Sequence, residues 1–280
     1  MEVLSIKNLC KKYETFHLDN VSFSLKKGEI RGFIGRNGAG KSTTLKSLLN
    51  FVHADSGQII FFGKDFSKNE FEIKQKIGFV AGGIDYYSKK KIADITKVTK
   101  KFYKSWDDEA YKKYIKIFKI EERKTPYELS AGMKVKYSLA LALSHKAELL
   151  ILDEPTSGLD PVSREELLDI FLDLADKGIA ILFSTHIISD LEKCADSITY
   201  IKEGKVMESL DTKEFISKFK IIETTKDQIQ ADLGNEILGY RKYKNKYTAL
   251  IRSDVAKKKN LNTFEADLES IIVHYEKGEM

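Results

Sequence analysis

The stretch that decides the fold of this chain is Gly35-Arg36-Asn37-Gly38-Ala39-Gly40-Lys41-Ser42-Thr43, which has the pattern G-x-x-x-x-G-K-[ST]. The run at 29–34 before it predicts a short buried strand, and residues 44–49 after it predict the first turns of a helix. Between these elements the glycines let backbone N–H groups close around a phosphate, because a side chain would block the approach. The helix N-terminus adds donors and partial positive charge. The stretch therefore predicts a phosphate-binding loop rather than an ordinary glycine-rich turn.

Three side chains at the end of this loop carry the chemistry expected of it. Lys41 is placed to reach the β- and γ-phosphates of a nucleotide. The hydroxyl of Ser42 is a suitable ligand for Mg²⁺, and Thr43 is next to it in the sequence. We therefore expect a nucleotide together with Mg²⁺ at this loop.

A second group of candidates follows an aliphatic run, Leu149-Leu150-Ile151-Leu152. The run predicts a buried parallel strand, and Asp153 and Glu154 come at its carboxyl end, where α/β sheets bind their ligands. There Asp153 could hold Mg²⁺ through water, and Glu154 could orient or deprotonate an attacking water. The alternative is a strand that ends in ordinary solvated acids. The phosphate loop in the same chain favours the functional interpretation.

Two further candidates depend more on their context. His186 follows the apolar run 179–183 at another predicted strand end, and we expect it to contact a γ-phosphate, although a lone histidine is more often structural. Tyr13 precedes the loop and could stack on an adenine ring. A tyrosine in a strand is also a common packing residue, so both interpretations of Tyr13 stay open.

The composition indicates a charged surface around a full core. Of 280 residues 42% are apolar and 32% are charged, which suits one large domain or a main domain with an appendage. The formal net charge of +5 is weak evidence for a polyanionic partner, and the lysine runs 89–91 and 257–259 are typical of solvated faces. Cys10 and Cys194 lack pairing or metal-site spacing and suit a reducing cytoplasm. With no signal peptide and no apolar run near ~20 residues, we expect other chains to supply any membrane spans.

Strand and helix patterns alternate along most of the chain, which predicts an α/β fold. After the short apolar strand at 77–80 the composition changes, because residues 85–128 are rich in Lys, Tyr and Asp and have helical spacing. One helix is expected over 92–102 and a second from 106–109 onward, with acidic residues in its first turn. We interpret this segment as a helical insertion between two sheet-forming halves.

The order of these motifs resembles that of the ATP-binding cassette (ABC) ATPases, and the likeness covers about residues 2–217. Each motif alone is modest evidence, whereas all of them in this order are highly specific. The positions that match the family pattern are Tyr13 as the adenine-stacking aromatic, residues 35–43 as the Walker A loop, residues 129–133 (Leu-Ser-Ala-Gly-Met) as the signature sequence, Asp153 and Glu154 as the Walker B acid and catalytic glutamate, residues 157–160 as the loop that crosses the dimer interface, and His186 as the switch histidine.

The resemblance implies an α/β P-loop NTPase fold with a mixed sheet core, an inserted helical subdomain at 85–145 within an ABC ATPase domain at 1–217, and a small C-terminal α+β appendage at 218–280. It also implies ATP and Mg²⁺ as cofactors and a head-to-tail dimer, formed by two copies or with a second ABC ATPase. In such a dimer Ser130 and Gly132 of one copy bind the γ-phosphate of the ATP held by the other copy. Asp160, in the loop that crosses the interface, is also implied to bind ATP. The loop residues implied to bind ATP are Gly35, Asn37, Gly38, Ala39, Gly40, Lys41, Ser42 and Thr43, and those implied to hold the metal are Ser42 and Asp153.

Two positions depart from the family pattern. The signature reads LSAGM where LSGGQ is the commonest form, but Ser130 and Gly132 are kept, so we expect a working site. Two residues after the strand at 77–80 the family usually has a glutamine that helps to hold Mg²⁺ and water, and this chain has Gly82 followed by Gly83. Either Asp85 takes over the contact, or the contact is missing. This replacement would change the affinity for Mg²⁺ and the coupling of hydrolysis to a partner.

The C-terminal residues 218–280 lie outside the family core. The favoured interpretation of these residues is an element that packs against the rest and supports the dimer, and the alternative is a ligand sensor. The pattern predicts strands over 219–223, 236–243 and 247–252 and a helix over 264–275 with Phe264, Leu268, Ile271 and Ile272 on one face.

The function we expect is ATP-driven export of a drug or peptide through separate integral membrane subunits, which the segment 85–128 would meet. The chain would then lie peripherally on the cytoplasmic face of the cell membrane. The sequence around Trp106-Asp107 and the LSxGM signature resemble bacterial exporters of the ABC-2 type. A soluble ABC protein acting on ribosomes or DNA is disfavoured by the single Walker A loop and the lack of sustained heptads, so no nucleic acid partner is expected. A regulatory binder that no longer hydrolyses ATP is disfavoured by Glu154 and His186.

Overall fold

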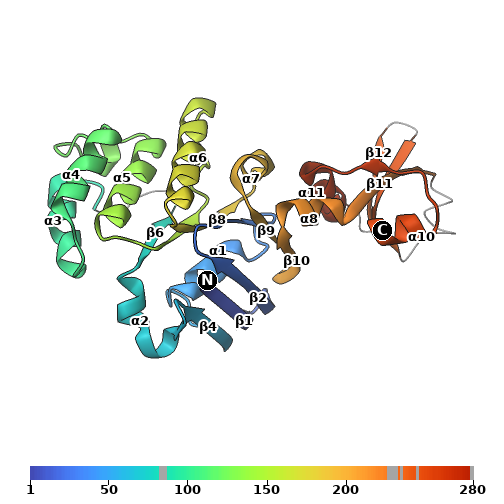
Figure 1. Cartoon of the computed structure of the whole chain (residues 1–280), viewed down its shortest axis with the longest axis horizontal. Helices are drawn as coiled ribbons and strands as arrows, with labels where there is room; N and C mark the ends of the chain where they lie inside the picture. The colour runs from blue at the N-terminus through green and yellow to red at the C-terminus, as the bar shows by residue number, and fades with distance from the viewer. Residues whose placement is uncertain (82–86, 226–232, 234–235, 244–245, 278–280) are drawn as a thin grey trace. The chain divides into compact units, whose positions relative to one another are not determined.

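The structure is a computed structural model that describes residues 1–81, 87–225, 233, 236–243 and 246–277 (Figure 1). The chain divides into two compact units, Met1–Ser209 and Leu210–Met280. Among the described residues, no helix has both the length and the apolar character needed to cross a membrane.

A six-stranded sheet with the order β10-β9-β3-β8-β7-β6 forms the centre of the first unit. The pairs β3–β8, β3–β9, β7–β8 and β6–β7 are parallel, and every residue of β3 and β8 is buried, as expected for strands covered on both faces. The carboxyl ends of β3, β7 and β8 therefore meet at one edge. The bounds of the strands are β3 Ile30–Ile34, β6 Ile77–Ala81, β7 Leu149–Asp153, β8 Ala180–Thr185, β9 Ser197–Lys202 and β10 Lys205–Asp211.

A smaller sheet with the order β2-β1-β4-β5 is antiparallel throughout. Its apolar residues share one core with Leu45 and Leu48 of helix α1 (Lys41–Leu48) and with Leu149 and Leu182 of the large sheet. This shared core fixes α1, and so the loop before it, between the two sheets. The bounds of these strands are β1 Glu2–Lys12, β2 His17–Lys26, β4 Ser56–Phe61 and β5 Lys64–Asp65.

The predicted helical insertion is confirmed as helices in the described residues. The Asp107 carboxylate accepts hydrogen bonds from the N–H groups of Glu109 and Ala110, both at 3.0 Å, and so starts α4 where the sequence predicts a helix. Figure 1 shows α3, α4 and α5 grouped together in the first unit. The helices of this unit are α2 Phe66–Lys74, α3 Ile92–Thr99 with the 3₁₀ turn η1 Lys100–Phe102, α4 Asp108–Ile117, η2 Pro126–Glu128, α5 Ala131–Ser144, α6 Pro161–Asp176 and α7 Ile188–Cys194.

The second unit contains an antiparallel sheet with the order β12-β13-β11-β14. The predicted strands are confirmed as β11, β12 and β13. The unit also contains two short helices, α8 and α10, that the sequence pattern did not predict. The elements are α8 Thr212–Ser217, β11 Phe219–Thr224, β12 Ile237–Tyr243, β13 Lys246–Arg252, α10 Ser253–Lys258, β14 Phe264–Glu265 and α11 Leu268–Lys277.

The predicted start of the last helix at Phe264 is wrong. Phe264 lies in β14 and its side chain is 51% exposed, so it is not part of the buried helix face. The Asp267 carboxylate accepts a hydrogen bond of 2.7 Å from the N–H of Ser270, and this cap starts the helix at Leu268. Leu268 and Ile271 are fully buried, which confirms the rest of the predicted face.

Candidate functional site

The predicted phosphate loop connects β3 to α1 at the edge where the parallel strands end. Gly40 has φ +111°, and a Cβ there would come within 2.6 Å of Leu18 and 2.9 Å of Phe16. Because the residue before the helix is glycine, it has no side chain to compete for the first N–H groups of α1. A Cβ at Gly35 would lie 2.3 Å from the carbonyl oxygen of Ile201. Both positions therefore require glycine, as the motif specifies: Gly40 because of its φ and its close neighbours, and Gly35 because a side chain would collide with the carbonyl oxygen.

Lys41 connects this loop to the strand that carries the acids. Its side chain is almost fully buried. The ammonium group donates hydrogen bonds to the carbonyl oxygens of Gly35 at 2.7 Å and Arg36 at 3.3 Å, and it lies 3.2 Å from Oε1 of Glu154. A cation is thus held where a phosphate chain would follow the loop.

The two acids lie at the end of β7, as predicted, but their side chains point to different partners. Asp153 Oδ1 accepts a hydrogen bond from the Ser42 hydroxyl at 3.1 Å. Glu154 has φ +53° in the left-handed region, and its Oε2 lies 2.8 Å from Nδ1 of His186. The structure therefore brings Lys41, Glu154 and His186 into one chain of contacts, with the Ser42–Asp153 pair beside it.

A hydroxyl and a carboxylate oxygen 3.1 Å apart are the hard oxygen ligands that Mg²⁺ prefers. Magnesium sites in nucleotide enzymes take one or two protein oxygens and fill the remaining positions with phosphate and water. Ser42 and Asp153 therefore fit this metal.

A cavity of about 650 Å³ opens over the loop. This volume is in the usual range for a site that holds a small molecule. Of the sequence-predicted residues, Gly35 and Ala39 are in the loop beneath the cavity and Asp153 reaches it through Ser42. The lining residues are Thr15, Phe16, Arg36, Asn37, Gly38, Gly40, Lys41, Ser42, Thr43, Glu154, Ser157 and His186.

Tyr13 lines a neighbouring hollow together with Lys12, Glu14 and Thr15, and Thr15 also lines the loop cavity. The ring is 42% exposed, and Nζ of Lys11 lies 5.7 Å from its centre. A partly exposed ring near the cavity is compatible with the predicted stacking role, which stays a prediction.

Ser130, Gly132 and Asp160 form a second group at the adjacent N-termini of α5 and α6. Ser130 Oγ accepts a hydrogen bond from the N–H of Met133 at 3.3 Å, and Asp160 accepts from the N–H of Ser163 at 3.0 Å. Hydrogen bonds from the hydroxyl and then the backbone N–H of Ser163 lower the pKa of the Asp160 carboxyl. A Cβ on Gly132 would have 3.6 Å of space to Ser163, so the two helix starts lie side by side. The residues that line the loop cavity of the same chain do not include Ser130, Gly132 or Asp160.

Sequence reasoning missed three side chains at this site. Phe16 and Thr15 line the cavity, and Ser184 lies at the end of β8 with its hydroxyl on Asp153. An aromatic three residues after Tyr13 and a serine two residues before His186 were the available signals. The positions Gly82, Gly83 and Asp85, where the family has its glutamine, lie outside the described residues.

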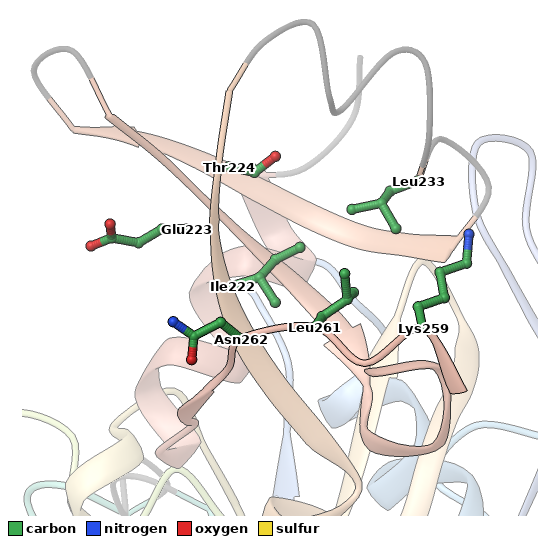
Figure 2. A pocket seen from close by; sticks show the side chains of 7 residues that line it. All are labelled: Ile222, Glu223, Thr224, Leu233, Lys259, Leu261 and Asn262. Carbon is green, nitrogen blue, oxygen red and sulfur yellow. The ribbon is translucent and has the colours of Figure 1, made fainter. Parts of the chain in front are cut away.

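The second unit has a cavity of its own, of about 450 Å³. Figure 2 shows Ile222, Leu233 and Leu261 turned toward the same space, whereas Glu223 points to the other side of β11. Lys259 lines the cavity and forms an ion pair of 2.8 Å with Glu236. Thr224 and Asn262 complete the lining.

Comparison with known proteins agrees with this geometry. The family model described as ABC transporter matches residues 18–157. The bacitracin transport ATP-binding protein BcrA of Bacillus licheniformis is 36% identical over 212 residues, which are 74% of this chain and 69% of that protein. The lantibiotic transport ATP-binding protein SrtF of Streptococcus pyogenes is 36% identical over 207 residues, which are 73% and 89% of the two chains.

Solved structures give the same result for the fold. The structure of the ATP-binding subunit of an ABC transporter superposes with a TM-score of 0.69 and 26% identity, over 76% of this chain and 91% of that one. A nucleotide-free ATP-binding cassette from an ABC transporter gives a TM-score of 0.66 with 25% identity, over 77% and 94%. These matches confirm the predicted P-loop α/β fold with its mixed sheets. The chain belongs to the ABC transporter family, as one of its ATP-binding subunits that hydrolyse ATP.

Proposed function

We propose that this ATPase drives the export of a peptide or drug through separate integral membrane subunits. The relatives named above are transport proteins for bacitracin and for lantibiotics, which supports this class of cargo. The chain would work on the cytoplasmic face of the cell membrane. The observation that carries the ATPase part of the proposal is the assembled contact chain Lys41–Glu154–His186 at the loop cavity, and the export part rests on the relatives.

In the proposed mechanism the loop amides and Lys41 bind the phosphates of ATP. Glu154 accepts a proton from the attacking water, and His186, 2.8 Å from that carboxylate, orients it and contacts the γ-phosphate. Ser42 and Asp153 would hold Mg²⁺, which neutralises charge on the phosphates when it is bound. Most of the rate enhancement comes from positioning and charge stabilisation, which a site made of a loop and one base can supply.

We assign Ser130, Gly132 and Asp160 to the ATP of a second subunit. Their place at two helix N-termini, away from the loop cavity, supports a role across a dimer interface, since helix N-termini suit anions. ATP would close the head-to-tail dimer and hydrolysis would release it. The second subunit is another copy or a related ABC ATPase.

The surface we assign to the membrane subunits includes the helical segment 85–128 and an aromatic patch next to it, formed by Phe51, Phe71 and Phe102. These rings are 59%, 64% and 67% exposed. Gln75 bonds to two members of the patch: its backbone N–H donates to the carbonyl oxygen of Phe71 at 3.3 Å, and its side-chain Nε2 donates to the carbonyl oxygen of Phe102 at 2.9 Å. Grouped exposed rings are typical of protein contact sites.

We divide the chain functionally into an ABC ATPase domain at 1–217, which includes the helical subdomain 85–145, and an accessory domain at 218–280. The core of the accessory sheet supports a packing or dimer-supporting role. Its cavity keeps a ligand sensor as the second possibility.

Co-purification tests the proposal directly. The chain is expressed with its neighbouring genes and captured from detergent-solubilised membranes. A stoichiometric partner with several membrane spans is the expected result. Recovery of an active ATPase from the soluble fraction alone would contradict the exporter assignment and favour a soluble ABC function on ribosomes or DNA.

A further inference from the structure

One buried hydroxyl contacts both acids of the site. Ser184 is the second-last residue of β8, is fully buried, and lies opposite Asp153 in the parallel register of β7 and β8. Its Oγ donates a hydrogen bond to Asp153 Oδ1 at 2.7 Å. The same Oγ accepts a hydrogen bond from the N–H of Glu154 at 3.0 Å. The side chain of Asp153 and the backbone of Glu154 are therefore bonded to the same atom, Oγ of Ser184.

The backbone at Glu154 needs such an anchor. Glu154 has φ +53°, a conformation that costs a residue with a side chain about 1 kcal/mol or more unless its surroundings hold it. Its N–H bonds to the carbonyl oxygen of Ser184 at 3.1 Å as well as to the hydroxyl. The left-handed turn directs the Glu154 carboxylate toward Lys41 and His186, so the turn determines where the base lies.

Asp153 depends on the same hydroxyl. Its Oδ1 accepts from two side chains, Ser42 at 3.1 Å and Ser184 at 2.7 Å. Ser42 belongs to the phosphate loop, whereas Ser184 belongs to the strand next to Asp153. Of the two contacts, the one from Ser184 is the shorter and is independent of the loop.

We propose that Ser184 is a positioning residue for ATP hydrolysis, because its hydroxyl sets the side chain of Asp153 and the backbone of Glu154 relative to each other. The inference rests on the roles proposed above for these two acids. Ser184 is not among the residues that line the loop cavity, so it would act through Asp153 and Glu154.

The test is Ser184→Ala with separate measurement of kcat, KM and ATP binding. A hydrogen bond to a charged group is lost, so kcat falls about 10-fold or more while KM and the Kd for ATP stay within about twofold. Ser184→Thr keeps the hydroxyl and retains most of kcat. Ser184→Cys, with a weaker donor of similar size, gives an intermediate kcat and provides the measurement if the alanine variant folds poorly.

Ser197→Ala is the matched control. Ser197 is equally buried on β9 of the same sheet, with β3 between it and β8, and its hydroxyl bonds to the Glu29 carboxylate instead. A purely structural effect would lower the Tm of both alanine variants and leave kcat per folded protein unchanged in both. The inference is overturned if kcat of Ser184→Ala equals that of Ser197→Ala, or if Ser184→Thr is as slow as Ser184→Ala.

Glu154→Gln, measured in parallel, separates this inference from the proposed function. If Glu154→Gln hydrolyses ATP at the parent rate, the assignment of the base fails, and Ser184 loses its proposed role with it. If Glu154→Gln is inactive while Ser184→Ala matches its control, the base stands and the role of Ser184 alone is rejected.

Discussion

The two groups of candidate residues in the ATPase unit differ in what satisfies their side chains. At the strand ends, Lys41, Glu154 and His186 contact each other across the loop and the elements after β7 and β8. At the helix starts, the exposed Ser130 and Asp160 hydrogen-bond to the backbone of their own helices. The first group is already assembled within one chain. The second is a pair of capped helix ends with no such connection to the cavity in the described residues, which is what a contribution to a second subunit requires.

Glu154→Gln is expected to have the largest effect, since it removes the proposed base from the assembled group. Hydrolysis should fall about 100-fold or more, while ATP binding persists and the ATP-bound dimer accumulates. Steady-state phosphate release and size-exclusion chromatography with ATP measure the two effects. Glu148→Gln is the control, because Glu148 is an exposed acid at the other end of the same strand, paired with Lys76. Parent-rate hydrolysis by Glu154→Gln would reject the assignment of the base.

Mixing two inactive variants tests whether the second group works across the interface. Ser130→Arg blocks the helix start but leaves Glu154 intact, and Glu154→Gln does the reverse. In a head-to-tail dimer of the two variants, one site combines the intact half of each chain. Activity should therefore return to about a quarter of the parent rate after random mixing, since half of the dimers are mixed and half of their sites are complete. Activity of the mixture no higher than that of either variant alone would contradict exchange between two copies.

The far end of α5 provides a pH-dependent prediction. His145 caps this helix, stacks on Tyr103 at 3.8 Å between ring centres, and lies 3.1 Å through Nδ1 from the carbonyl oxygen of Gln75. Burial lowers the pKa of His145 from 6.5 to about 4. The unfolded chain therefore binds a proton first as the pH falls, and the stability that neutral His145 contributes above pH 6.5 is lost progressively toward pH 4.

Between pH 7 and pH 5 this histidine should cost about 2 kcal/mol of the free energy of unfolding. His145→Phe keeps a ring against Tyr103 and removes the titration, so its stability should fall less over the same interval. Urea unfolding of both proteins at the two pH values gives the comparison. If His145 is buried as described, the free energy of unfolding of the parent falls by about 2 kcal/mol more than that of the variant between the two pH values. Equal falls in the two proteins would show that His145 is not held neutral by burial.

The difference between the two groups also explains what the sequence could predict. Residues 35–43 and the acids after the run 149–152 are contiguous motifs, and local backbone chemistry fixes their conformation. Ser184 gave no comparable signal, because its contact with Asp153 depends on the register between two strands 31 residues apart. Phe264 was misplaced because its spacing fits the helix face, whereas the Asp267 cap decides where the helix begins. The short helix α7 was missed since its seven residues contain too few turns for a periodic pattern.

Tyr13 provides the smallest and most discriminating prediction. If it stacks on the adenine, Tyr13→Ala weakens ATP binding roughly fivefold, a value at the low end for base stacking because the ring is already 42% exposed. Tyr13→Phe keeps the stack, and inorganic tripolyphosphate, which has no base, should bind all three proteins alike.

An unchanged affinity of Tyr13→Ala for ATP would leave Tyr13 as a packing residue of its own hollow. Phe16, which lines the loop cavity itself and packs against Gly40, would then be the better candidate for the adenine contact. Either result decides how far the assembled group extends beyond the phosphates, since the loop amides and Lys41 can bind a triphosphate without any contact to the base.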